Sequence, residues 1–134
     1  SLRIMFRRTI LLASLGSALL LAGCRTPQQP MNPGFSIPES VTAAEVEKAI
    51  KLGAIRRGWT TKEIKPGLIQ ATYVKGSYTA CVDIAYTNKS WGIEMNPKTN
   101  MKNADGTVNP KYNQWVRNLA HDIGKELQII CTTR

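Results

Sequence analysis

The sequence predicts an α+β protein, a two-layer sandwich in which a four-stranded antiparallel meander is flanked by an N-terminal and a C-terminal helix. Two stretches with helical spacing of apolar residues, over 43–57 and after 109, enclose a middle third in which apolar residues alternate. Short segments separated by turn residues favour an antiparallel meander. The expected order is α-β-β-β-β-α, and one domain accounts for the 134 residues because a domain takes roughly 100 to 200.

The first helix is expected over residues 43–57. Thr42 and Glu45 have the spacing of a capping box, in which the two side chains satisfy free amides at the start of a helix. Apolar residues then recur on one helical face: Val46, Ala49, Ile50, Gly53 and Ala54. Gly58 follows two arginines and suits the end of this helix.

The middle third is expected to form four strands, over residues 59–65, 68–75, 78–87 and 91–95. Pro66 and Gly67 suit a type II turn between the first two strands. In the third strand, Ala80 and Val82 belong to an apolar face that alternates with a mixed face containing Cys81. One face of the sheet is therefore expected to pack against the helices.

The last helix is expected to begin at Asn109 and Pro110, which are typical of an N-cap and a first helical position. The apolar stripe that follows is the strongest periodic pattern in the chain: Tyr112, Trp115, Val116, Leu119, Ile123, Leu127 and Ile130. This stripe should lie across the apolar face of the sheet, beside the first helix.

Residues 1–23 have the form of an export signal. Three arginines and no acid precede an uncharged, aliphatic run over 9–22. That run is shorter than the roughly 20 residues a membrane-spanning helix needs. It ends in the letters LAGC, which resemble the lipobox of bacterial lipoproteins. The resemblance implies acylation of Cys24, which becomes the mature N-terminus and attaches the protein to the lipid bilayer. Because Arg25 rather than aspartate follows, it also implies the outer membrane, with the domain facing the periplasm.

Residues 24–40 are expected to be the lipidated cysteine and a proline-rich tether, and residues 41–134 the periplasmic domain. Four prolines and few apolar residues in the stretch predict that it contributes no core element. At about 3 Å per residue, the tether could hold the domain several nanometres from the membrane.

Composition and charge narrow the class of partner. A charged fraction of 20% is too low for a disordered polyelectrolyte. The net charge of +9 favours anionic partners, but removal of the three signal arginines lowers it to +6. The charge therefore supports an anionic ligand only moderately.

From Gly58 to Leu127 the chain resembles a group of small proteobacterial lipoproteins. The residues that carry the resemblance form a spaced pattern: Gly58, Trp59, Pro66, Gly67, Ile69, Ala71, Ala80, Val82, Asp83, Ile84, Tyr86, Tyr112, Asn113, Trp115, Val116 and Leu119. The resemblance implies the same α+β lipoprotein domain and brings no established activity. A histidine is common in the group near the positions of Tyr78 and Asn109, and this chain has neither.

No catalytic, metal-binding or cofactor-binding constellation is recognisable. The one histidine, His121, is expected on the solvent side of the last helix, and adjacent Asp122 does not share its face. No C-x-x-C or H-x-x-x-H spacing, glycine-rich phosphate loop or serine nucleophile motif occurs. The sequence therefore predicts a protein that is not an enzyme, with no cofactor and no metal.

Cys81 and Cys131 remain once Cys24 carries lipid. An oxidising compartment favours a disulfide between them, with two free thiols or a redox-active pair as alternatives. The disulfide requires residues 129–134 to leave the helix, because Cys81 alternates onto the face away from it.

The connection over residues 96–109 is long enough to be a binding loop. Its candidate ligand-contacting residues are Lys98, Asn100, Lys102 and Asp105. The alternative, which the sequence favours, is that Asp105 and Gly106 form a tight turn between two short extended arms.

Trp59, Trp91 and Trp115 could stack on sugars or bases. For Trp91 and Trp115 the alternation and the helical stripe favour packing in the core instead.

Together these features predict a membrane-anchored, non-enzymatic binding or structural module of the cell envelope. Its partner would be an envelope component or protein, bound through the mixed face of the sheet or the 96–109 loop. An alternative is a binder of an anionic polymer such as lipopolysaccharide, peptidoglycan or nucleic acid. An envelope hydrolase or thiol oxidoreductase is a remote third hypothesis.

Overall fold

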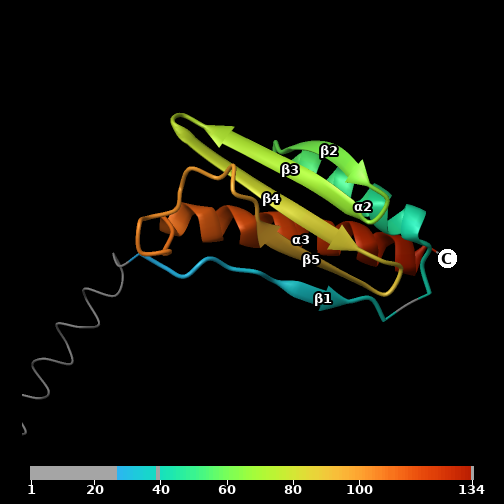
Figure 1. Cartoon of the computed structure of the whole chain (residues 1–134). Coiled ribbons are helices and arrows are strands. Elements are labelled where there is room, and N and C mark those ends of the chain that lie inside the picture. The colour runs from blue at the N-terminus through green and yellow to red at the C-terminus, as the bar shows by residue number, and fades with distance from the viewer. Residues whose placement is uncertain (1–26, 39, 134) are drawn as a thin grey trace, which may run out of the picture.

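A computed structural model of the chain describes residues 27–38 and 40–133 and confirms the α+β class. Two helices, α2 (Ala43–Arg56) and α3 (Pro110–Thr132), lie side by side on one face of an antiparallel sheet (Figure 1). The strands are β1 (Gly34–Ser36), β2 (Thr60–Lys65), β3 (Leu68–Lys75), β4 (Tyr78–Tyr86) and β5 (Ser90–Met95). The helix-facing side of the sheet and the apolar stripes of both helices form one core.

The described sheet has five strands, so the prediction of a four-stranded sheet is wrong. Strands β2 to β5 form the expected meander, each antiparallel to the next, and the order is β1-β5-β4-β3-β2. The additional strand, β1, lies antiparallel to β5 at the edge of the sheet, with Phe35 opposite Trp91. It comes from the stretch that was expected to be only a tether.

The described part of that stretch is attached to the domain along its length. The amide of Asn113 in α3 accepts a hydrogen bond from the backbone of Met31 at 2.8 Å and donates to the side chain of Gln28 at 3.0 Å. Further along, the backbone N–H of Ile37 donates to the carbonyl of Lys89 at 2.8 Å. The prolines hold φ in the range of extended chain, which suits an edge strand as well as a linker. The stretch therefore contributes an edge strand whose three residues are exposed, and Met31 and Ile37 on either side of it pack against the core.

The ends of α2 form as the sequence predicts. The Thr42 hydroxyl accepts from the N–H of Glu45, and the Glu45 carboxylate accepts from the N–H of Thr42, which is the reciprocal pattern of a capping box. Gly58 takes a φ of +82°, and its N–H donates to the carbonyl of Ile55 at 3.0 Å. The chain can therefore reverse from α2 directly into β2.

Helices α2 and α3 approach closely at Gly53. A Cβ atom on this glycine would lie 2.8 Å from the backbone nitrogen of Ile123. The absence of a side chain at residue 53 thus allows the two backbones to come into contact.

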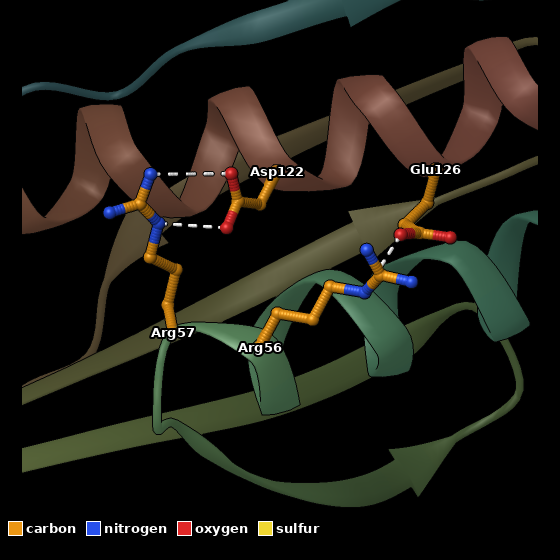
Figure 2. Close-up of polar contacts among 4 residues, drawn as sticks. All are labelled: Arg56, Arg57, Asp122 and Glu126. Atoms are coloured by element: carbon orange, nitrogen blue, oxygen red, sulfur yellow. Dashed lines mark hydrogen bonds and ion pairs between the residues drawn. The ribbon is translucent and has the colours of Figure 1, made fainter.

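Two ion pairs join the end of α2 to α3, as Figure 2 shows. The Arg56 Nε lies 3.0 Å from a carboxylate oxygen of Glu126, and the Arg57 Nε lies 2.7 Å from one of Asp122. The Glu126 side chain is only 8% exposed, so Arg56 neutralises a carboxylate that is largely removed from water.

Candidate functional site

A groove of about 580 Å³ lies where the end of α2, the β3–β4 hairpin and the first half of α3 meet. Four aromatic side chains line it: Trp59, Tyr73, Tyr78 and Trp115. Three cationic side chains, those of Arg57, Lys75 and Lys111, and the amides of Gln114 and Asn118 also line it. We refer to this feature as the aromatic groove. Its volume is within the roughly 300 to 1,000 Å³ of small-molecule sites.

The aromatic rings contact one another in a row. Tyr73 packs edge to face on Trp115 with centroids 4.9 Å apart, and its other neighbour, Trp59, is 5.6 Å away. Tyr78 also packs edge to face on Trp115, with centroids 6.4 Å apart. Trp59 is buried, whereas the other three rings are half-buried and so combine core packing with a surface that a ligand can reach.

The charged side chains that line the groove are all cationic. The ammonium of Lys111 lies 5.3 Å from the centroid of the Tyr78 ring, a cation–π arrangement. Arg57 is held by Asp122, which leaves Lys75 and Lys111 as lysines without an ion pair to a described residue. Among the described residues that line the groove there is no aspartate or glutamate. The site therefore favours an anionic group over a cation.

Local structure explains why these residues gather. The strand register pairs Lys75 with Tyr78 across the hairpin, and Tyr73 lies two residues before Lys75, so all three share one face of the sheet. On α3 the groove residues follow the i, i+3, i+4, i+7 spacing of one helical face: Lys111, Gln114, Trp115 and Asn118.

Sequence reasoning found only part of this set. It weighed Trp59 and Trp115 as stacking residues and favoured the core for Trp115, which in the structure both contacts the core and lines the groove. The expectation that Trp91 packs in the core is confirmed by its 5% exposure. Tyr73 and Tyr78 were missed, because strand alternation does not distinguish a residue that lines a groove from one that packs only in the core.

The 96–109 loop is built around a tight turn, and the favoured alternative for it is confirmed. Lys102 bridges Val108 in an antiparallel arrangement, and the N–H of Gly106 donates to the carbonyl of Asn103 at 3.1 Å. Asp105 accepts from the hydroxyl of Thr107 at 2.6 Å, and this hydrogen bond lowers the pKa of the Asp105 carboxyl. The Asp105 side chain thus stabilises the turn itself.

Of the other candidate loop residues, Asn100 is also engaged within the protein. Its side-chain oxygen accepts from the N–H of Thr79 at 2.7 Å, and its nitrogen donates to the carbonyl of Ser77 at 2.9 Å. Lys98 and Lys102 are exposed, and neither lines the aromatic groove. Lys102 instead lines a separate pocket of about 540 Å³, together with Thr99 of the same loop and Glu94 of β5.

Cys81 and Cys131 are free thiols in the structure, so the favoured disulfide is not formed. Helix α3 continues to Thr132 and keeps Cys131 on the helical side of the sheet. Cys81 is buried in β4, where its sulfur accepts from the hydroxyl of Thr72 at 3.5 Å. Strand alternation places Cys81 on the face away from the helices.

A second groove, of about 420 Å³, lies between β1 and the last turns of α3. Its walls include Phe35, Trp91, Gly124 and Leu127, and none of the described residues that line it is charged. It therefore offers a ligand little to fix its orientation.

His121 is exposed on α3 and does not line either groove. Within residues 27–38 and 40–133, no group of three or more His, Cys, Asp or Glu side chains is placed to hold a metal ion. In the same part of the chain, neither helix combines the length and apolar character needed to cross a membrane. Residues 1–23, expected to be the signal segment, and Cys24, the expected acylation site, lie outside the described residues.

Comparison with known proteins gives no match: no family model, no curated protein and no solved structure is significantly similar to the chain.

Proposed function

We propose that the protein is a lipid-anchored, non-enzymatic binding module of the periplasm and that the aromatic groove is its ligand site. The observation that carries the proposal is the groove itself: among the described residues, aromatic rings and two lysines without an ion pair converge there, and no carboxylate lines it. Convergent polar groups on an apolar, preformed concavity are the usual form of a binding site. The groove replaces the 96–109 loop as the preferred site, because Asp105 stabilises the turn of that loop and Asn100 bonds to Ser77 and Thr79.

The absence of an acid–base pair supports binding rather than catalysis. Among the described residues, the groove contains no histidine and no carboxylate, the groups that most often serve as general bases. The one-sided charge supports the anionic class of ligand.

The anchoring part of the proposal rests on the LAGC motif. Acyl chains on Cys24 would hold the protein at the outer membrane, since two or more chains anchor stably where one does not. Replacing Cys24 with serine is expected to move the protein from the membrane fraction to the soluble periplasmic fraction. Retention of the C24S chain in the membrane would contradict lipid anchoring at this residue.

The binding part is tested by site-specific photo-crosslinking in intact cells. A photoreactive residue at position 114, which is exposed and lines the groove, is expected to capture envelope material. The matched control is position 121, exposed on the same helix outside the groove. Equal capture at the two positions, or none at position 114, would overturn the groove as the binding site.

A further inference from the structure

We propose that the ligand of the aromatic groove is an acidic saccharide, whose sugar ring packs on the half-buried aromatic rings while its acidic group lies between Lys75 and Lys111. This inference rests on the proposed function, because it names the chemical class of ligand for that site.

The rings provide a platform for one or two sugar units. A pyranose has a face of C–H groups that packs against the electron-rich face of an aromatic ring. Tyr73, Tyr78 and Trp115 lie within 6.4 Å of their ring neighbours, so they form a compact patch. A single strand of nucleic acid instead needs successive platforms along a basic track.

The amides are suited to hydroxyl groups. Gln114 is exposed and Asn118 half-buried, and the two lie four residues apart on the groove-facing side of α3. Each amide has both donors and an acceptor, as sugar hydroxyls do. Such polar groups at the margin of an aromatic platform give orientation to a saccharide.

The acidic group follows from the charge of the groove. Lys75 and Lys111 project from the hairpin and from the first turn of α3, and both are exposed. A carboxylate or phosphate on the sugar would neutralise these ammonium groups by charge-assisted hydrogen bonds. A neutral saccharide would bring no negative charge to neutralise the two ammonium groups.

The test measures ligand binding to the full chain in detergent micelles by tryptophan fluorescence and calorimetry. The probes are a tetramer of galacturonic acid, a neutral chitotetraose, inorganic polyphosphate and an oligothymidylate. The galacturonate tetramer is expected to bind about tenfold more tightly than chitotetraose and to change the tryptophan emission, because Trp59 and Trp115 line the groove.

Variants of the groove distinguish the contribution of charge to binding from the contribution of aromatic stacking. The double variant K75E/K111E is expected to weaken galacturonate binding about tenfold or more. Its matched control, K62E/K98E, makes the same charge change at two exposed lysines outside the groove and is expected to change affinity by less than about twofold. The W115F variant should weaken galacturonate binding but leave any polyphosphate binding unchanged.

Equal affinity for chitotetraose and the galacturonate tetramer would overturn the acidic part of the inference. Polyphosphate or oligothymidylate binding as tightly as the galacturonate tetramer, with W115F having no effect, would overturn the saccharide part. Crosslinking specific to residue 114, without binding of either saccharide, would contradict the acidic-saccharide inference. The same result would still support the proposed function. Failure of both experiments would remove the groove as a site.

Discussion

At the scale of single residues, Tyr112 has the least satisfied polar group in the described core. The residue is fully buried at the start of α3, and its hydroxyl has no hydrogen-bond partner among the described residues. Burial raises the pKa of the Tyr112 hydroxyl well above that of an exposed tyrosine. An unpaired buried polar group lowers stability by about 1–3 kcal/mol.

The Y112F variant is therefore expected to raise the free energy of unfolding by about 1 kcal/mol, because it removes the hydroxyl and keeps the ring. Urea unfolding followed by circular dichroism measures the change. A decrease in the free energy of unfolding would show that the hydroxyl has a partner.

The groove shows how far single residues can be interpreted from sequence. Trp59 and Trp115 stand out because tryptophan is rare and amphipathic, and both line the groove. Tyr73 and Lys111 give no comparable signal, since their proximity depends on packing a hairpin against a helix about 40 positions away. The general expectation of an anionic ligand came from net charge, whereas its location required the tertiary structure.

At the scale of elements, α2 and the four strands of the meander were predicted to within a residue or so at most ends. These elements are encoded locally, by a capping box, by alternation and by turn residues. Strand β1 is not encoded in this way, because its three residues have no periodicity and its pairing depends on the edge of β5. For this reason the sequence did not predict that residues 34–36 would pair with β5.

Replacing two helical glycines, Gly53 and Gly124, with alanine is expected to change the free energy of unfolding in opposite directions. At Gly53 an alanine Cβ would lie 2.8 Å from backbone of α3, so G53A is expected to lower the free energy of unfolding by about 1–2 kcal/mol despite the helix propensity of alanine. At Gly124 an added Cβ would meet no atom of another element within 4 Å, so G124A should raise the free energy of unfolding by about 0.5–1 kcal/mol. Chemical denaturation of both variants gives the comparison. Shifts of the same sign would contradict the close approach at Gly53.

At the scale of the whole molecule, Asn113 joins the chain before β1 to the domain. This residue is 2% exposed, and its amide bonds Met31, Gln28 and the carbonyl of Gln29. Other described contacts also hold this part of the chain: Gln28 forms a bridge with Val108, Met31 packs against the core, and the carbonyl of Pro33 accepts from the N–H of Ile93 at 2.9 Å.

The N113A variant is expected to loosen residues 28–31 and to lower the free energy of unfolding by about 1 kcal/mol, because it removes the hydrogen bonds that the Asn113 amide makes to this partly buried segment. Hydrogen exchange at the Met31 amide should accelerate. The neighbouring Q114A variant is the control, since Gln114 is exposed. Unchanged protection of Met31 in N113A would show that other contacts hold the segment.

The attachment of this segment changes how far an acyl anchor on Cys24 would let the domain travel. Since Gln28 is bonded to the domain, Cys24 is only four residues from a point of attachment, a span of about 14 Å at most. Gln28 pairs with Val108, close to the first turn of α3, where Lys111 lines the groove. The groove would then stay within a short distance of the bilayer surface. The effective concentration of the groove would be high for ligands anchored in the same membrane and negligible for ligands on the far side of the periplasm.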